Sequence, residues 1–540
     1  MKGAIVSGID PVQVEIETAL NPGTGFKVVG LGKQEVRESK ERIRAAFSSC
    51  DFSWPSERIV TNLAPADIPK TGTNLDLPIA LSVLVQSNQI GNGFSDDVLV
   101  VGELSLSGSL KDIDGALAIA KSLDDDQPIL FPEQSESEIA LLKYAEGVKR
   151  DINAYPVSDL EEAVEVLEQG EGREATITED DLERTFAKPR DFADIKGQEE
   201  AKKSLEIAAA GGHNVLMIGP PGEGKSMLAK AIPGIQPELS NQEKLELTRI
   251  YSAAGELPSS SHVISRRPYQ DIHHTSSKAS VIGGGTGRPE PGEITKAHLG
   301  ILFLDEFPEF RRDVLEALRQ PLEEGEVTIS RTNGSATFPC QFTLVAAMNP
   351  CPCGYNQIDG RECTCTDSEV KKYKNKLSGP LMDRIDIKIK VTQVSGEEYL
   401  SEDENEPSEV IRQRVEEAWR NQQNRYEGES FSYNSEIPAG KVVDYCLLDD
   451  SAEEAYREVL DEVEITTRKK DKLLKIARTV ADLNNSNMVY KKHISQAAQL
   501  ADQPDVQQYL SQFSDYDTCP NCGRRVEASD AFCRHCGGEI

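Results

Sequence analysis

One segment constrains this chain more than any other: residues 219–226 read GPPGEGKS. They match the pattern G-x-x-x-x-G-K-[S/T], follow the apolar run Val215–Ile218 and precede the helix-like stretch SMLAKAI, which is the context of a phosphate-binding loop. Lys225 would place a positive charge on the phosphates, and the Ser226 hydroxyl would hold Mg²⁺. Rather than a chance glycine-rich turn, we therefore predict an ATP site whose loop consists of Gly219, Pro220, Pro221, Gly222, Glu223, Gly224, Lys225 and Ser226.

A second element follows about 80 residues later, where Gly300–Glu306 reads GILFLDE. An apolar strand that ends in two carboxylates is a weak signal by itself, but after a phosphate loop it predicts a hydrolytic centre. Asp305 would bind Mg²⁺, directly or through water, and Glu306 would orient and deprotonate the attacking water.

Two further polar residues lie where the same chemistry could use them. Asn349 follows the apolar strand Phe342–Ala347, so it could contact the γ-phosphate or the attacking water; the alternative is a turn asparagine before a proline. Arg384 lies between acidic residues just before another strand, and its permanent charge suits contact with ATP held by a neighbouring subunit. The alternative is a local ion pair with Asp383 or Asp386.

The chain of 540 residues is too long for one domain, since domains run to roughly 100–200 residues. Apolar strands and amphipathic helices alternate at the N-terminus, and a polar, charged stretch follows. Buried-type strands then alternate with helices, a charged helical part comes next, and the end is rich in cysteine. The expected units are 1–165, a linker 166–190, an α/β core 191–395, a helical lid 396–508 and a cysteine-rich unit 515–540.

Single strands and helices can also be expected from the pattern of apolar residues. The predicted N-terminal strands are AIVSGI, VQVEIE and FKVVGL, with helices at VRESKERIRAAFSS, LDLPIALSVLVQS and LEEAVEVLEQ. In the core the clearest predicted strands are NVLMIG, ILFLDE and FTLVAAMN.

The charge balance limits the possible partners. A net charge of −32 disfavours diffuse binding to nucleic acid or to anionic membranes, so any contact with DNA must come from local basic clusters. Adaptation of the host to salt is another explanation of this acidity. No apolar run is long enough for a membrane span or a signal peptide, and we expect a cytoplasmic, reducing location.

Eight of the eleven cysteines fall into two groups. Two C-x-x-C pairs near the end, each followed by glycine, predict a tetrahedral Zn²⁺ site that would stabilise a small ribbon through Cys519, Cys522, Cys533 and Cys536. Such a ribbon could bind DNA or protein, or cap the chain. Two C-x-C pairs after the Asn349 strand predict a second zinc site, the alternative being four reduced cysteines in a loop, at Cys351, Cys353, Cys363 and Cys365.

These elements together resemble a known family. Residues 273–310 read HHTSSKASVIGGGTGRPEPGEITKAHLGILFLDEFPEF. With GPPGEGKS, MNPCPCGY, SGPLMDRID and, near the ends, NLAPADIPK and ARTVADL, they closely resemble the magnesium-chelatase-like AAA+ ATPases of the ComM (YifB) type. The resemblance implies a hexameric ATP-driven motor that promotes branch migration of recombination intermediates, notably in natural transformation. It assigns Asn349 as first sensor, Arg384 as trans-acting finger and Arg478, otherwise an ordinary helix-surface charge, as second sensor.

The resemblance also implies where branched or single-stranded DNA would bind. Ring helicases of this clade contact DNA through a hairpin before the sensor strand, and Glu324–Phe338 alternates like a strand around an Asn-Gly turn signal. Arg331 lies beside that turn, although a hairpin without DNA contact is the alternative. Lys371 and Lys372 belong to a basic run that could meet phosphates or form a solvated loop.

We therefore expect an α/β multidomain chain: an AAA+ P-loop core with an N-terminal α+β domain that resembles ribosomal protein S5 and the Lon protease domain, a helical lid and a zinc ribbon. An ATP-dependent protease is one rival, but the positions of the Lon-type serine and lysine fall at Asn74 and near Leu117, so no Ser-Lys dyad is present. The ATPase subunit of a metal chelatase is the other rival, although nothing here specifies a porphyrin site.

Overall fold

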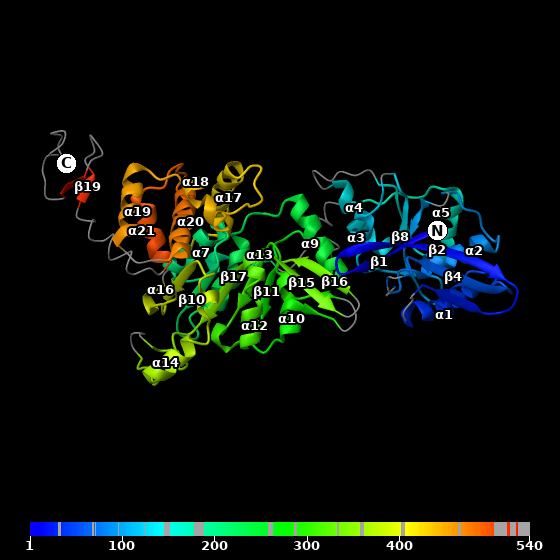
Figure 1. The fold of residues 1–540 in the computed structure, drawn as a ribbon, viewed down its shortest axis with the longest axis horizontal. Helices are drawn as coiled ribbons and strands as arrows, with labels where there is room; N and C mark the ends of the chain where they lie inside the picture. The colour runs from blue at the N-terminus through cyan, green and yellow to red at the C-terminus, as the bar shows by residue number, and fades with distance from the viewer. Residues whose placement is uncertain are drawn as a thin grey trace.

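The computed structural model describes residues 1–30, 34–66, 68, 70, 72–94, 97–124, 126–144, 152–177, 188–257, 263–285, 289–331, 334–356, 361–400, 405–462, 466–501, 516–518 and 525–527. Figure 1 shows an elongated arrangement, with the N-terminal elements at one end, a sheet region in the middle and the C-terminal helices beyond it. None of the described helices combines the length and the apolar character that crossing a membrane requires.

The N-terminal segment is built on a seven-stranded mixed sheet with the order β3-β4-β2-β1-β5-β8-β9. β1 pairs antiparallel with β2 and parallel with β5, so the start of the chain lies inside the sheet. The strands are β1 (Lys2–Ser7), β2 (Asp10–Asn21), β3 (Phe26–Val29), β4 (Arg58–Ala64), β5 (Leu99–Val100), β8 (Ile129–Pro132) and β9 (Ala154–Val157), and a separate pair is formed by β6 (Glu103–Leu104) and β7 (Leu110–Lys111). The helices are α1 (Gln34–Ser49), α2 (Asp76–Gln86), α3 (Ala116–Lys121), α4 (Glu136–Tyr144) and α5 (Leu160–Gln169).

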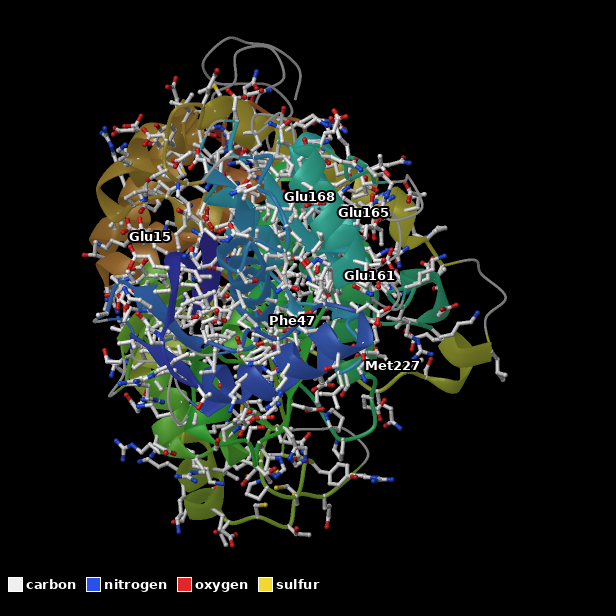
Figure 2. All side chains as sticks on the ribbon, turned by 90° about the vertical axis from the view of Figure 1, so that its right-hand side faces the viewer. Glu15, Phe47, Glu161, Glu165, Glu168 and Met227 are labelled. Carbon is white, nitrogen blue, oxygen red and sulfur yellow. The ribbon has the colours of Figure 1, made fainter. Side chains whose placement is uncertain are left out.

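Helix α5 carries part of the excess negative charge on its exposed face. Asp159 caps its start by accepting a hydrogen bond from the backbone of Glu162 at 2.9 Å. Figure 2 labels Glu161, Glu165 and Glu168 on this helix, and all three are exposed while the apolar residues between them are buried. The exposed face of α5 is therefore acidic, and it repels polyanions.

The central segment contains five parallel strands in the order β11-β14-β17-β10-β18. Alternate residues of β14 face two different cores: Leu302 and Leu304 lie in one, Ile301 and Phe303 in the other. Strands that are buried on both faces are typical of a parallel sheet covered by helices. The strands are β10 (Val215–Ile218), β11 (Tyr269–Ile272), β14 (Ile301–Leu304), β17 (Thr343–Met348) and β18 (Ile387–Lys390).

Short helices and two hairpins connect these strands. The helices are α7 (Glu199–Gly211), α8 (Lys225–Ala231), α9 (Asn241–Ala253), α10 (Lys278–Ile282), α11 (Glu293–Lys296), α12 (Arg312–Ala317), α13 (Pro321–Glu324), α14 (Asp367–Lys374) and α15 (Gly379–Met382). The hairpins are β12 (Gly283–Gly284) with β13 (Glu290–Pro291), and β15 (Glu326–Arg331) with β16 (Gly334–Pro339). Because the strands are parallel, the loops that follow β10, β11, β14 and β17 all leave the same edge of the sheet.

The C-terminal helices pack on the central segment through α7. Gln422 donates to the carbonyl of Ala210 at 2.8 Å, and His213 lies 2.8 Å from the hydroxyl of Thr479, so buried polar contacts fix the two parts together. The helices are α16 (Gly396–Leu400), α17 (Ser408–Arg425), α18 (Val442–Tyr445), α19 (Asp450–Glu462), α20 (Thr467–Leu483) and α21 (Lys491–Leu500).

The N-terminal segment contacts the central segment at two places. Ser252 of α9 donates a hydrogen bond to the carboxylate of Glu138 in α4, and its carbonyl accepts one from Gly115 at 3.1 Å. Ala336 and Phe338 of β16 lie against the turn at Gly8. The two segments therefore share one apolar core.

The structure confirms a strand or helix at each of the segments that the sequence analysis names by its residues. The predicted linker 166–190 is only partly a linker, since α5 continues to Gln169 and Ala175 donates to the carbonyl of Ala154 at 2.8 Å. The apolar side chains of Ala175 and Ile177 are buried, and this burial holds a polar stretch against the N-terminal sheet. Of the cysteine-rich unit, only β19 (Tyr516–Thr518) and β20 (Arg525–Glu527) are described, as an antiparallel pair; Cys519, Cys522, Cys533 and Cys536 lie outside the described residues.

Candidate nucleotide site

The predicted phosphate loop connects β10 to α8 at the carboxyl edge of the central sheet. Gly222 and Gly224 have φ of 88° and 83°, where residues with a side chain are strained. A Cβ at Gly222 would meet no atom within 4 Å, whereas one at Gly219 would collide with the backbone of Val391. The shape of the loop and its close approach to the end of β18 therefore both depend on glycine.

Lys225 joins this loop to the strand that carries Asn349. Its Nζ donates to the carbonyls of Gly219 and Pro220, both at 2.7 Å, and to Oδ1 of Asn349 at 3.1 Å. Burial lowers the pKa of Lys225, while the carboxylate of Asp305 opposes that shift. Two residues that are 124 positions apart thus meet at the mouth of the loop, where a γ-phosphate would lie.

Ser226 and Asp305 form the second contact of the site. The Ser226 hydroxyl donates to Oδ2 of Asp305 at 2.8 Å, across the gap between α8 and the end of β14. A hydroxyl and a carboxylate oxygen side by side are the donor set that Mg²⁺ prefers. The residues present therefore fit a magnesium site beside the phosphates.

Glu306 follows directly and has an unusual backbone. Its φ is 52°, in the left-handed region, and its amide donates to Oδ1 of Asp305 at 2.8 Å. The side chain is 55 % exposed, and its Oε2 lies 3.0 Å from Nδ1 of His274. Sequence reasoning missed His274; the available signal was its position just after β11, the strand next to β14.

Arg384 lies at the opposite edge of the sheet. It precedes β18, whose Ile387 is paired with Val215 at the start of β10, while the phosphate loop leaves the other end of β10. The guanidinium is 12 % exposed and pairs with Glu323, while also donating to the carbonyl of Pro380 at 2.6 Å. The alternative considered from the sequence was an ion pair with Asp383 or Asp386. Arg384 does form an ion pair, but its partner is Glu323.

Arg478 is fully buried within the C-terminal helices. It donates to the carbonyls of Asn487 and Ser486 and lies 3.0 Å from Asp482. Burial lowers its pKa, and the Asp482 carboxylate opposes that shift. The interpretation as an ordinary surface charge is wrong, because its position on α20 faces the helix core rather than solvent. None of these contacts joins Arg478 to the phosphate loop.

The predicted hairpin is confirmed as β15 and β16, closed by the pair Arg331 and Gly334. Arg331 is exposed and donates to the carbonyl of Gly285 at 3.3 Å. The adjacent Asn333 of the turn signal lies outside the described residues. Arg331 thus stands at the outer end of a hairpin whose buried face is apolar.

The basic run is a helix rather than a loop. Lys371 and Lys372 lie in α14, which begins with a capping box in which Thr366 and Glu369 bond each other's backbone. Both lysines are exposed, while Tyr373 between the basic residues is buried and anchors the helix.

The cysteine cluster lies directly after the Asn349 strand, and its four sulfur atoms are all within 4.8 Å of one another. The Sγ atoms of Cys351, Cys353 and Cys363 are 3.3 to 3.6 Å apart. Tetrahedral Zn²⁺ with Zn–S bonds of about 2.3 Å requires sulfur–sulfur distances of roughly 3.8 Å, so the four side chains, including Cys365, fit a zinc ion closely.

This cluster touches the phosphate loop. Gly354 has φ of 90°, and a Cβ there would lie 2.7 Å from Cδ of Pro221. The amide of Asn356 also points at Sγ of Cys351, 3.3 Å away. A metal held here would therefore fix the loop that packs on Pro221 and follows Asn349.

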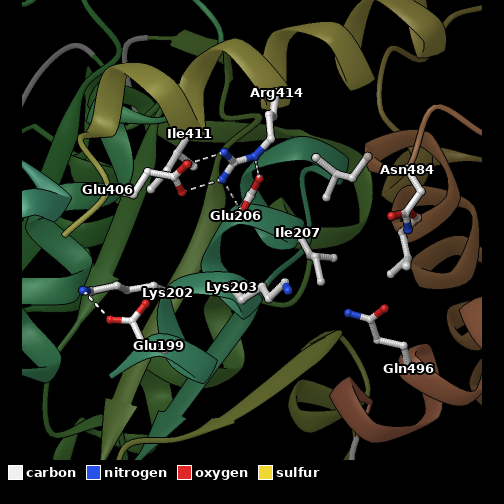
Figure 3. Close-up of a pocket in the computed structure, with 12 residues that line it drawn as sticks. Glu199, Lys202, Lys203, Glu206, Ile207, Glu406, Ile411, Arg414, Asn484 and Gln496 are labelled. Carbon is white, nitrogen blue, oxygen red and sulfur yellow. Dashed lines mark hydrogen bonds and ion pairs between the residues drawn. The ribbon is translucent and has the colours of Figure 1, made fainter. Parts of the chain in front are cut away.

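A cavity of about 520 Å³, lined by both charged and apolar side chains, lies between α7 and the C-terminal helices. Figure 3 shows Arg414 between Glu206 and Glu406, with ion pairs of 2.6 and 2.5 Å, and Lys202 beside Glu199. No residue of the phosphate loop lines it. The nucleotide site is therefore assigned from side-chain chemistry and not from cavity size.

The fold and the site together define a mixed α/β P-loop protein with an AAA+-like domain. Three family profiles match along the chain: magnesium chelatase subunit ChlI at 191–399, subunit ChlI of Mg-chelatase at 12–135, and the ChlI C-terminal part at 405–501.

Curated relatives extend the similarity over almost the whole chain. The chain is 36 % identical over 502 residues to the uncharacterized protein YifB of Escherichia coli K12, covering 91 % of this chain and 94 % of that one. It is 36 % identical over 497 residues to the competence protein ComM of Haemophilus influenzae, with the same coverage. The chain belongs to the ComM/YifB-type family of magnesium-chelatase-like proteins, and this membership suggests ATPase activity.

Two similarities are more limited. A magnesium-chelatase 38 kDa subunit of Cereibacter sphaeroides is 28 % identical over 181 residues, which is 30 % of this chain and 53 % of the subunit. Lon protease 2 of Bacillus subtilis is 29 % identical over 149 residues, 26 % of each chain.

Proposed function

We propose that this chain is an ATP-driven ring motor that acts on DNA. The observation that carries the ATPase part is the pair of contacts Lys225–Asn349 and Ser226–Asp305, which gather four predicted residues around one loop. Glu306 stands beside them as the base that takes a proton from the attacking water, and Asn349 orients that water or the γ-phosphate. Mg²⁺ held by Ser226 and Asp305 would neutralise charge on the phosphates.

The position of Arg384 supports a ring of subunits. Since Arg384 lies across the sheet from Lys225, one chain has no means of placing both on the same ATP. In a ring, Arg384 would leave Glu323 and stabilise charge on ATP held by the next subunit. Six subunits is the number that the family resemblance implies.

DNA as the substrate is supported by two features. One relative is named as a competence protein, and in this chain an exposed arginine, Arg331, ends the hairpin that precedes β17 in the sequence. Lys371 and Lys372 add exposed positive charge on α14. Branch migration or helicase activity in recombination or transformation is the process that we propose for this motor, in the cytoplasm.

The test is the ATPase rate with and without forked or single-stranded DNA, measured together with strand displacement. Stimulation by DNA and displacement of a strand are the expected results. The variant Arg331→Ala tests the DNA contact: it should retain the ATPase rate measured without DNA and weaken the stimulation of that rate by DNA. An ATPase that no DNA structure stimulates, and that displaces no strand, would contradict the DNA motor.

A chelatase-like role is the second candidate, because a magnesium-chelatase subunit matches part of the chain. ATPase stimulation only by a chelatase partner would favour it. Proteolysis is disfavoured despite the similarity to a Lon protease. The two dyad positions hold Asn74, which has no hydroxyl, and Leu117, which is buried in α3 and has no amine, so no Ser-Lys dyad is present there.

We also propose that the helices from α17 to α21 form a lid over the nucleotide, with Arg478 stabilising that lid from within. Residues 515–540 are proposed to form a zinc ribbon that binds DNA or protein, or caps the chain. The Cys351–Cys365 cluster is proposed as a second zinc site. Removal of residues 515–540 should lower the zinc content by one equivalent and leave the ATPase rate largely intact, while an unchanged content would contradict the ribbon.

A further inference from the structure

Asn214 joins three segments at the amino edge of the central sheet. It directly precedes β10, the strand that lies between β17 and β18. Its side-chain amide donates to the carbonyl of Arg384 at 2.9 Å, and its side-chain oxygen accepts from the amide of Leu344 at 2.8 Å. These partners fix the orientation of the side chain, because a carbonyl oxygen only accepts and a backbone N–H only donates.

The backbone of Asn214 holds the same loop. Its amide donates to the carboxylate of Asp386 at 3.0 Å, and its carbonyl accepts from the amides of Asp386 and Ile387 at 2.9 and 3.0 Å. Ile387 is the first residue of β18. The stretch from Arg384 to Ile387 is therefore bonded to a single residue at the start of β10.

The points from which Asn214 is anchored are themselves rigid. Val215 and Leu344 are both buried, and they lie in the two different cores on either side of the sheet. Lys472 of α20 also donates to the carbonyl of Ile385, so a C-terminal helix holds the loop as well. The backbone at Arg384 is therefore fixed by contacts that reach into the core.

The guanidinium of Arg384 is held less firmly than its backbone. It pairs with Glu323, whose side chain is 57 % exposed, and it donates to the carbonyl of Pro380. An ion pair with so exposed a partner is weak, so the guanidinium can leave Glu323 for the phosphates of a neighbouring subunit. Only the side chain then has to move, because the loop that carries it stays in place.

We propose that Asn214 is a positioning residue for Arg384: it fixes the loop from which the guanidinium reaches ATP held by the next subunit. Misplacement by about 1 Å can cost about a hundredfold in rate, so the position of this loop matters as well as the charge that it carries. The inference rests on the proposed trans role of Arg384, since Asn214 acts only through that residue.

The experiment measures hydrolysis and binding of ATP by the full-length protein. Asn214→Asp keeps an oxygen for the amide of Leu344 but loses the N–H that holds Arg384, so kcat should fall about ten- to hundredfold with Kd for ATP unchanged. In an Arg384→Ala background the same change should have no further effect on kcat. The matched control is Asn153→Asp, which adds the same charge at an asparagine that precedes β9 and donates to the carbonyl of Asp126. Its kcat should equal that of the wild type.

Mixed rings separate a role through Arg384 from an effect on the ATP site of the same chain, since Asn214 also precedes the strand that leads to the phosphate loop. In a ring of Asn214→Asp and Lys225→Ala subunits, some interfaces combine the intact Lys225 of the first with the intact loop of the second. These interfaces should recover hydrolysis. A defect confined to the ATP site of the Asn214→Asp subunit would leave both kinds of site inactive at every mixing ratio.

The outcomes distinguish this inference from the proposed ring. If Arg384→Ala recovers activity on mixing with Lys225→Ala but Asn214→Asp does not, the ring stands and Asn214 is not a positioning residue. If neither recovers although mixed rings form, the trans role fails and the inference fails with it. Asn214→Ala removes both side-chain contacts without adding charge, and it replaces Asn214→Asp in the mixing test if that variant does not fold. If Asn214→Ala lowers kcat while Asn214→Asp does not, the contact with Leu344 is the one that matters and the proposal is wrong.

Discussion

The buried carboxyl of Glu138 makes the joint between the N-terminal and central segments sensitive to pH. Its side chain is 2 % exposed, and its Oε1 accepts hydrogen bonds from the amide of Leu117, at 2.5 Å, and from the hydroxyl of Ser252. Burial raises the pKa of Glu138 to about 8, against the opposing effect of those two hydrogen bonds. At neutral pH the carboxyl of the folded chain therefore keeps its proton.

The sign and size of the effect follow from linkage. Below the unfolded pKa of 4.5 both the folded and the unfolded chain hold the proton, so titration of Glu138 does not change the free energy of unfolding there. As the pH rises from there to about 8, the unfolded chain releases the proton and the folded chain does not, so stability falls by up to about 1.4 kcal/mol per pH unit. From pH 5 to 7 the loss is on the order of 3 kcal/mol.

Glu138→Gln should remove this dependence, because the amide stays neutral and its carbonyl oxygen accepts the same two hydrogen bonds. The variant should match the wild type near pH 5 and melt roughly 5 °C higher or more at pH 7. Trp54 can report the transition of the N-terminal segment once Trp419, the second tryptophan, is replaced by Phe. A local probe is needed because a multidomain chain need not unfold in one step.

The matched control is Glu133→Gln, which removes an exposed carboxylate from the turn before α4. Its melting temperature should differ from the wild type by the same small amount at every pH. If the difference between Glu138→Gln and the wild type is equally independent of pH, Glu138 does not hold a proton in the folded state, and the reasoning is refuted.

The other predictions concern the nucleotide and metal sites. Lys225→Ala should abolish ATP binding, whereas Glu306→Gln should bind ATP without hydrolysing it, since an amide does not take a proton. Retention of ATP on a filter distinguishes the two variants. Turnover by Glu306→Gln at the wild-type rate would show that Glu306 is not the base. Cys353→Ser should lose one zinc by metal analysis, while Cys340→Ser, a buried cysteine outside the cluster, should lose none; equal zinc contents would contradict the site. Arg384→Ala should assemble and bind ATP but hydrolyse it on the order of 10³-fold more slowly. Mixing it with Lys225→Ala should recover activity, and mixed rings without recovery would refute a trans role.

The sequence was most informative where chemistry is local. The phosphate loop needs glycine at fixed positions, so GPPGEGKS predicts the turn from β10 to α8, with Gly222 and Gly224 in positive φ. Asp305 and Glu306 at the end of β14 could be predicted for the same reason, because the strand fixes the edge of the sheet at which the two carboxylates lie. Asn349 could be expected near them once three strands were known to be parallel.

Contacts that depend on strand order and helix packing could not be predicted. His274 reaches Glu306 only because β11 is the neighbour of β14, and no residue in either strand specifies that adjacency. The sequence around Arg478 is typical of a charge on a helix surface. In the structure, however, the side chain of Arg478 is buried next to Asp482 among the C-terminal helices. The helix at Lys371 could have been found, since Thr366 and Glu369 stand at capping-box spacing.

The parallel sheet itself gives a reason for assembly. Lys225 follows the carboxyl end of β10, whereas Arg384 precedes the amino end of β18, the adjacent parallel strand. Four residues of strand separate the two edges by about 13 Å before the loops are added. Both strands are fixed by buried residues in the same core, so the two residues stay at opposite edges of the sheet. If Arg384 acts on ATP at all, the ATP belongs to another copy, and the ion pair with Glu323 is then the state of this residue before that copy docks.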